Sequence, residues 1–190
     1  GRPSDYGLPD PDYRLYESPP VVNSLVLHHL GHGDITARRD ITAIEGHRVT
    51  FGDGESADYD VLLLATGYEL DYPFLDRGDL AWPAGVDAPQ LYLNVFHPER
   101  DDIFLMGMVE ASGLGWQGRH EQAEMVARYL RGLRDGTEAA KELRAEKAAR
   151  FDRATGGMNY IDLPRMAYYV DKATFRNAVN ARISKLKGAA

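Results

Sequence analysis

The segment DVLLLATGYELDYPFL, residues 60–75, constrains the fold more than any other part of this 190-residue chain. A run of apolar or small residues after an aspartate predicts a buried strand over 60–66. The strand ends in Thr66-Gly67-Tyr68, and the side chains of Thr66 and Gly67 are too small to fill a core. Because small residues let the backbone approach another group closely, we predict that something other than a side chain occupies this space.

The composition is that of an ordinary globular protein, with 44% hydrophobic and 27% charged residues. The length allows one domain or parts of two. A net charge of −7 argues against nucleic-acid and anionic-membrane partners, because basic side chains do not gather to neutralise phosphates. The chain has no cysteine, which excludes disulfides and thiolate metal sites, and we expect a cytoplasmic protein. No apolar run approaches the roughly 20 residues that span a bilayer, and the N-terminus does not resemble a signal peptide.

The first part of the chain predicts a loop, a short helix and several strands. Residues 1–24 contain prolines at 3, 9, 11, 19 and 20, which exclude a long helix or a central strand. The segment 21–32 predicts a short helix that ends at Gly31 or Gly33. β-Branched residues between turn-forming residues then predict a meander of strands at 35–39, 41–45, 48–51 and 60–66, with a tight turn at Asp53-Gly54.

Further along, two apolar segments predict strands at 90–96 and 102–109. A glycine-rich loop follows, and then a helix that is predicted to end at Gly136. The predicted apolar face of this helix consists of Ala123, Val126, Ala127, Leu130 and Leu133.

The remainder of the chain predicts two more helices. Thr137 is placed to cap a helix over 137–151 that is so densely charged that most of it must face solvent. A last helix over 171–186 has an apolar stripe that we interpret as core packing. The stripe consists of Phe175, Val179, Ile183 and Leu186.

The string GLGWQG at 113–118 has the glycine spacing of a dinucleotide-binding fingerprint and lies between a strand and a helix. That motif requires a second strand ending in an acidic residue, whereas a charged helix follows here, so we disfavour a pyrophosphate-binding loop. A glycine loop that leads into a helix beginning near 117–121 still offers backbone N–H groups and a positive partial charge to an anionic group.

The histidines give no convincing metal or catalytic site. His28 and His32 are spaced like metal ligands on a helix, but no third ligand has suitable spacing and Gly31 weakens the helix. His47, His97 and His120 are isolated, and we interpret them as surface or hydrogen-bonding residues. The chain also lacks a nucleophile elbow, a P-loop and a carboxylate pair, so it shows no self-contained catalytic apparatus.

The run DVLLLATGY followed by DYPFL closely resembles the flavin-containing monooxygenases, which are class B flavoprotein monooxygenases. Upstream, Gly33-Asp34-Ile35 and the F-x-D-G turn at 51–54 are similar to the family's approach to this motif. Downstream, LYLNVFHPERDDIFLMGMVEASG and the helix that contains E-Q-A are also similar. The resemblance covers about residues 1–135, although Trp116-Gln117 differs from the commoner family loop.

The resemblance implies an α/β fold, namely the C-terminal part of a flavoprotein with two dinucleotide-binding domains, with a strand meander and C-terminal helices. The family's two glycine fingerprints would precede this chain. The implied divisions are a proline-rich connecting loop at 1–24, the end of the NADPH-binding domain at 25–70, the returning part of the FAD-binding domain at 71–135, and a helical C-terminal extension at 136–190.

The resemblance also implies FAD and NADPH as cofactors. Thr66, Gly67 and Tyr68 would lie near bound cofactor or the crossing between the domains. A second group of residues would lie beside the flavin, namely Gly107, Gly115, Trp116, Gln117 and Gly118. For Trp116, the alternative is that its side chain packs against the C-terminal extension. Because the flavin performs the chemistry, we assign no catalytic acid or base and no metal ligand.

The implied activity is insertion of one oxygen atom from O2 into a small organic substrate, by N- or S-oxidation or a Baeyer–Villiger reaction. The alternatives are a related flavin-dependent NAD(P)H reductase without oxygen insertion, or a noncatalytic interaction module. Because Gly1 is not an initiator methionine, we expect the chain to be part of a longer enzyme and to be inactive alone. Its expected partners are the missing N-terminal half and a small-molecule substrate, and a homodimer is compatible with the sequence.

Overall fold

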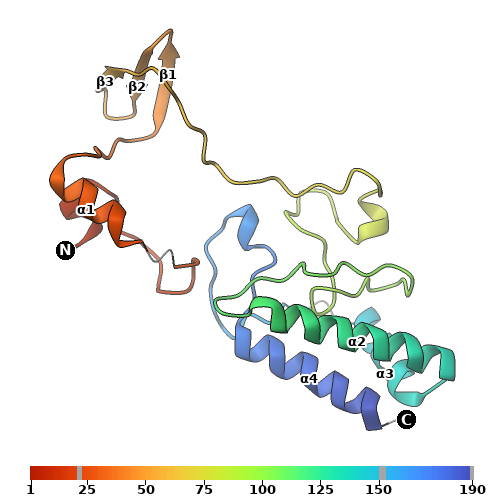
Figure 1. Ribbon diagram of the computed structural model, residues 1–190. Helices are drawn as coiled ribbons and strands as arrows, with labels where there is room; N and C mark the ends of the chain where they lie inside the picture. The colour runs from red at the N-terminus through yellow and green to blue at the C-terminus, as the bar shows by residue number, and fades with distance from the viewer. Residues whose placement is uncertain (21–22, 150–152, 189–190) are drawn as a thin grey trace. The chain divides into compact units, whose positions relative to one another are not determined.

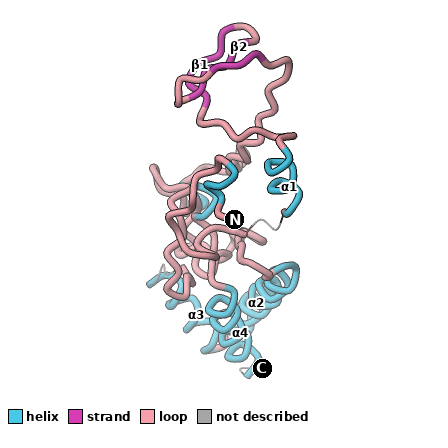
Figure 2. Tube along the Cα trace, turned by 90° about the vertical axis from the view of Figure 1, so that its left-hand side faces the viewer, coloured by secondary structure: helices cyan, strands magenta, loops and turns pink. Residues whose placement is uncertain are grey.

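A computed structural model of the protein describes residues 1–20, 23–149 and 153–188. The chain combines helices with a small antiparallel sheet and divides into two compact units. The first unit consists of Gly1–Arg14 and Val21–Glu69, and the second consists of Leu15–Pro20 and Leu70–Ala190. Figure 1 labels the helices and strands, and Figure 2 separates helix, strand and loop by colour.

The first unit begins with a short 3-10 helix, η1 (Pro3–Tyr6), followed by helix α1 (Ser24–His32). Asn23 caps α1, since its side chain accepts a hydrogen bond from the backbone N–H of Leu25 at 3.0 Å. The helix ends at Gly33, which has a φ of 81°. The helix predicted within 21–32 is therefore confirmed from Ser24, and residues 21–22 lie outside the described residues.

The sheet of this unit has three antiparallel strands, β1 (Ile41–Glu45), β2 (Arg48–Phe51) and β3 (Ser56–Asp58), in sequence order. The predicted strands at 41–45 and 48–51 are confirmed. The predicted turn at Asp53-Gly54 connects β2 to β3, with Gly54 at a φ of 86°.

Four other predicted strands are wrong, because none of them forms a ladder with another described segment. Residues 35–39 and 60–66 are loops, and Val61 and Leu63 in the second loop are 81% and 85% exposed rather than buried. Segment 90–96 instead folds back on itself, and 102–109 makes only an isolated bridge from Phe104 to Phe96. Apolar sequence alone does not make a strand where no neighbouring backbone supplies hydrogen bonds.

The second unit is built on three packed helices, α2 (Gly115–Asp135), α3 (Glu138–Ala149) and α4 (Lys172–Gly188). Helices α2 and α4 run side by side in Figure 1, and α3 packs against both of them. Short 3-10 helices, η2 (Gly78–Leu80) and η3 (Pro164–Met166), interrupt the loops around them. The core contains residues from all three helices and the preceding loops, including Val95, Phe96, Met125, Tyr129, Leu143, Phe175 and Val179.

Several predicted features of these helices are confirmed. Helix α2 ends before Gly136, which has a φ of 70°, and the Thr137 hydroxyl accepts a hydrogen bond from the backbone N–H of Ala140 at the start of α3. The predicted stripe of α4 is buried, with Phe175 and Val179 fully covered.

The predicted apolar face of α2 is wrong. Ala123, Ala127 and Leu130 are exposed, and Val126 and Leu133 are only partly buried. A different face enters the core because two polar side chains on it find internal partners, as described below. The residues buried on that face are Gly118, Glu121, Gln122, Met125, Tyr129 and Gly132.

Candidate functional site

The loop from Gly107 to the first turn of α2 contains three glycines in the left-handed region of φ. Gly107, Gly113 and Gly115 have φ values of 82°, 73° and 56°. A Cβ atom added to Gly115 would meet no other atom within 4 Å, and one added to Gly107 would meet only Arg119 Nε at 3.9 Å. The backbone at these two turns is therefore uncovered on one side, which leaves room for the close approach of another group.

The start of α2 is exposed and lacks a side-chain cap. Leu114 occupies the N-cap position and makes no side-chain capping hydrogen bond. Gly115, Trp116 and Gln117 are all exposed, and Trp116 is 86% exposed. The alternative that Trp116 packs against the C-terminal extension is therefore wrong for the described residues. The helix N-terminus keeps the positive partial charge of its free N–H groups.

Gly118 has a different environment from the other predicted site residues. It is buried, and a Cβ atom at this position would lie 2.4 Å from Cγ of Leu114, which is itself buried. Close packing of Leu114 against the helix explains why position 118 is glycine without any bound group. Whether Gly118 also contacts a cofactor stays a prediction.

Gln122 connects the Gly107 turn to a second strained turn. Its side chain is fully buried, and its Oε1 accepts a hydrogen bond from the backbone N–H of Gly107 at 3.2 Å. Its Nε2 donates to the carbonyls of Leu93 and Asn94, both at 3.3 Å. These two residues have φ values of 49° and 57°, which are rare for residues other than glycine. The sequence pattern did not identify Gln122, because it follows Glu121 and lies outside the face that was predicted to be apolar.

Glu121 and Arg176 form the other polar contact inside this helical packing. Arg176 on α4 donates to both carboxylate oxygens of Glu121, at distances of 2.5 to 3.1 Å. The Glu121 side chain is only 8% exposed. A buried, hydrogen-bonded pair of this kind fixes how α2 and α4 lie against each other.

Thr66, Gly67 and Tyr68 belong to the first unit, in its exposed terminal segment. Gly67 has a φ of 90°, and no other atom lies within 4 Å of the position of an added Cβ. The conformation alone therefore favours glycine there. Tyr68 is fully exposed. The remaining predicted site residues belong to the second unit.

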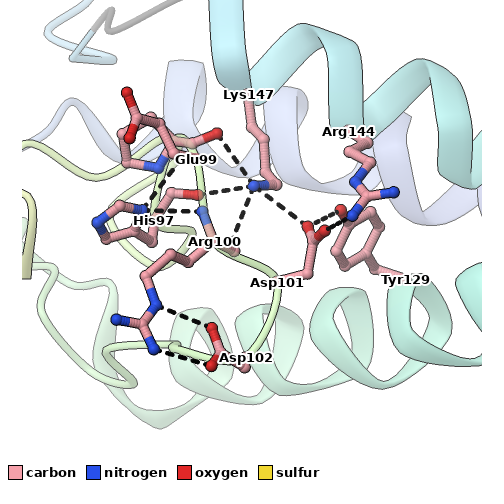
Figure 3. Close-up of polar contacts among 9 residues, drawn as sticks. His97, Glu99, Arg100, Asp101, Asp102, Tyr129, Arg144 and Lys147 are labelled. Carbon is pink, nitrogen blue, oxygen red and sulfur yellow. Dashed lines mark hydrogen bonds and ion pairs between the residues drawn. The ribbon is translucent and has the colours of Figure 1, made fainter. Parts of the chain in front are cut away.

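A buried lysine organises the loop after Phe96 (Figure 3). The Nζ atom of Lys147 donates to the carbonyls of His97, Pro98 and Arg100 at 2.8, 3.0 and 3.0 Å. It also lies 3.2 Å from Oδ1 of Asp101, and the lysine side chain is only 1% exposed. The ammonium group thus replaces its hydration shell with carbonyl and carboxylate oxygens. This contact joins residues about 50 positions apart in the sequence, so local patterns did not reveal it.

Asp101 receives further donors in the same cluster. The hydroxyl of Tyr129 donates to Asp101 Oδ1 at 2.5 Å, and Arg144 forms an ion pair with Oδ2. Burial would raise the pKa of Asp101, but the hydrogen bonds from Tyr129 and Lys147 outweigh it and hold this pKa below its usual range. Loop 97–102 is therefore attached to both α2 and α3.

His97 is buried in the neutral form beside this cluster. Its Nδ1 accepts hydrogen bonds from the backbone N–H groups of Glu99 and Arg100 at 3.1 and 3.0 Å. Its Nε2 has no hydrogen-bond partner among the described residues. Burial lowers the pKa of His97, and the nearby Lys147 ammonium lowers it further. His97 therefore has a structural environment, in agreement with its interpretation as a hydrogen-bonding residue.

The rings of His28 and His32 lie near each other, with centroids 4.2 Å apart. In the described ranges of the chain, no group of three or more His, Cys, Asp or Glu side chains could hold a metal ion. In the same ranges, no helix is both long and apolar enough to cross a membrane.

The start of α2 combines two glycine turns that are open on one side with a helix N-terminus that has no side-chain cap. Comparison with known proteins shows the family of the chain. Residues 3–175 match the profile of a protein family described as flavin-binding monooxygenase-like. The chain belongs to this family. Membership implies a flavin cofactor and relates the chain to monooxygenases.

Curated relatives agree with this assignment. Flavin-containing monooxygenase 1 of Sus scrofa is 24% identical over 131 residues, and flavin-containing monooxygenase 2 of Homo sapiens is 25% identical over 130 residues. Dimethylaniline monooxygenase (N-oxide-forming) 2 of Rattus norvegicus is 29% identical over 133 residues. Each match covers 68% of this chain and 24% of the relative, so the chain corresponds to about a quarter of the length of these proteins. No solved structure matches the chain significantly.

Proposed function

We propose that the chain is part of an FAD- and NADPH-dependent monooxygenase that inserts one oxygen atom from O2 into a small organic substrate. The observation that carries this proposal is the uncovered backbone at Gly107 and Gly115 beside an uncapped helix N-terminus, in a chain of the flavin-binding monooxygenase-like family. The proposed reactions are oxidation of the substrate at nitrogen, at sulfur or next to a carbonyl group. The name of the Rattus norvegicus relative specifies N-oxide formation for that protein.

The residues present suit a flavin. Gly107 and Gly115 lack side chains that would exclude a flat ring. No atom lies within 4 Å of an added Cβ at Gly115, and at Gly107 Arg119 Nε lies 3.9 Å away. The free N–H groups at the start of α2 would favour negative charge, which increases on a flavin when it is reduced. Trp116 and Gln117 are exposed at the same helix start and would border the cofactor. When bound, the flavin would supply the redox chemistry, while these residues bind and orient it.

Thr66, Gly67 and Tyr68 are proposed to contact cofactor or the domain crossing when the enzyme is complete. The support is their exposure, together with the exposed apolar residues that precede them, Val61 to Leu64. A row of exposed apolar residues with unpaired backbone can add to a neighbouring sheet. We propose that the N-terminal half of the same enzyme provides this sheet, so that 25–70 ends the NADPH-binding domain and 71–135 returns to the FAD-binding domain.

The test uses the full-length gene product with bound FAD, NADPH and oxygen-18 gas. The enzyme is incubated separately with a tertiary amine, a sulfide and a cyclic ketone, and the masses of the products are measured by mass spectrometry. One atom of oxygen-18 in a product supports the proposal. Reduction of FAD by NADPH that yields only hydrogen peroxide or a reduced artificial acceptor would favour the related reductase, and a full-length protein that binds no FAD would favour a noncatalytic module.

A further inference from the structure

The guanidinium group of Arg119 connects the two glycine turns at the start of α2. Its Nη1 donates to the carbonyl of Gly115 at 2.9 Å, and its Nη2 donates to the carbonyl of Val109 at 3.3 Å. Its Nε lies 3.9 Å from the position that a Cβ on Gly107 would occupy. One side chain therefore contacts the backbone at both ends of the candidate flavin loop.

The charge of Arg119 is balanced within the same loop. Its Nη2 donates to Oε2 of Glu110 at 3.0 Å, and the two side chains are 28% and 38% exposed. The guanidinium carbon also lies 6.0 Å from the centre of the exposed Trp116 ring. The planar, five-donor shape of arginine suits simultaneous bonds to two carbonyls and a carboxylate, and a lysine ammonium cannot reproduce this arrangement.

Gln122 holds the same turn one helical turn further along α2. It accepts a hydrogen bond from the N–H of Gly107, while Arg119 binds the carbonyl of Val109 and its Nε lies 3.9 Å from the position of an added Cβ on Gly107. Positions 119 and 122 are three residues apart and so lie on neighbouring parts of one helix face. Because Gln122 is fully buried and Arg119 is partly exposed, Arg119 can be changed with less disturbance of the core.

We infer that Arg119 is a positioning residue that holds the Gly107 and Gly115 turns at a fixed separation, so that both turns can contact the flavin at once. This inference rests on the proposed function. Arg119 acts through the two turns: when it is absent, each turn retains its glycine but loses the link to the other. Its loss should therefore reduce cofactor affinity more than fold stability.

The test compares Arg119→Gln and Arg119→Lys in the full-length gene product with the matched control Arg128→Gln. Arg128 lies on the same helix and pairs with Glu124, away from the glycine loop. We expect Arg119→Gln to weaken FAD binding about tenfold or more and to change the visible spectrum of bound FAD, as expected for the loss of a preorganised contact. The FAD affinity of Arg119→Lys should lie between those of Arg119→Gln and the wild type, and the FAD affinity of Arg128→Gln should equal that of the wild type.

Hydrogen exchange of the FAD-free variants separates positioning from a general effect on folding. Faster exchange in Arg119→Gln that is confined to residues 107–118 supports the inference, whereas faster exchange throughout α2 and α4 overturns it. Equal FAD affinity and spectrum in Arg119→Gln and wild type would also overturn it, with the proposed function intact. Failure of the wild-type protein to bind FAD would instead remove the proposed function, and this inference with it.

Discussion

At the scale of single residues, Gly118 is determined by packing. The Leu114 side chain occupies the space in which a Cβ at position 118 would lie, and Leu114 belongs to the buried core of the second unit. Glycine inside a helix normally lowers stability relative to alanine by about 1 kcal/mol, so its presence here indicates a steric requirement.

We predict that Gly118→Ala lowers the free energy of unfolding by about 1 to 2 kcal/mol, because the overpacking of Leu114 exceeds the gain in helix propensity. The measurement is a urea titration followed by the fluorescence of Trp82, which is 5% exposed. Gly78→Ala is the matched control, since no atom lies within 4 Å of its added Cβ. Equal stabilities of the two variants would show that Leu114 moves aside without cost.

At the scale of elements, loop 97–102 joins α2 to α3 through a small number of buried polar groups. Lys147 comes from α3 and Tyr129 from α2, and both contact Asp101. Each partner satisfies a group that would otherwise be buried without a hydrogen bond. The attachment of α3 to the rest of the unit therefore depends on polar contacts as well as on apolar packing.

Lys147→Met should lower the free energy of unfolding by about 3 to 5 kcal/mol, because the change leaves buried carbonyls and a carboxylate without their cation. Lys141→Met on the same helix removes an exposed ion pair with Glu138 and should cost less than about 1 kcal/mol. Both variants are measured by urea titration at neutral pH. A cost for Lys147→Met as small as that of the control would show that the cluster contributes little to stability.

The buried neutral His97 predicts a dependence of stability on pH. Its pKa in the folded protein is lowered from the ordinary value of 6.5, first by burial and then by Lys147. The unfolded chain therefore binds a proton at higher pH than the folded chain does, so stability is complete above pH 6.5 and decreases as the pH falls below it.

His97→Gln should remove this decrease in melting temperature between about pH 7 and 5, because glutamine does not titrate. The exposed His120 provides the control variant His120→Gln, which should retain the wild-type profile. If His97→Gln and wild type lose stability equally over this range, another group causes the dependence.

Features governed by neighbouring residues were predictable from the sequence. The ends of α1 and α2 at Gly33 and Gly136, the Thr137 cap and the buried stripe of α4 all follow from local backbone and side-chain chemistry. The predictions of strands at 60–66 and 90–96 were wrong, because strand formation depends on pairing with another segment of backbone, which the local sequence does not reveal. The Lys147 cluster was missed because its members are distant in sequence.

In the candidate site, too, local features were predictable from the sequence and contacts between distant residues were not. The glycine turns followed from the order of residues, and the turns at Gly107 and Gly115 have the backbone conformation that favours glycine. The helix was predicted to begin near 117–121, but it begins at Gly115. The contacts that hold these turns, made by Arg119 and Gln122, required the three-dimensional structure. Their polar side chains carried no local signal that distinguished them from surface residues.

At the scale of the whole molecule, the chain consists of two compact units and corresponds to about a quarter of the length of its relatives. The central claim is that residues 107–118 of the second unit form the flavin side of a cofactor site. Because the cofactor is proposed to bind at a defined segment, a measurement that locates binding along the chain is a more direct test than an activity assay.

That measurement is hydrogen exchange with mass spectrometry on the full-length gene product, with and without FAD. Backbone amides at 107–118 should exchange more slowly when FAD is bound, because a ligand that covers the two glycine turns and the start of α2 stabilises their closed state. Helix α3 (Glu138–Ala149) serves as the internal reference and should change little. Bound FAD at one molecule per chain with unchanged exchange at 107–118 would contradict the account.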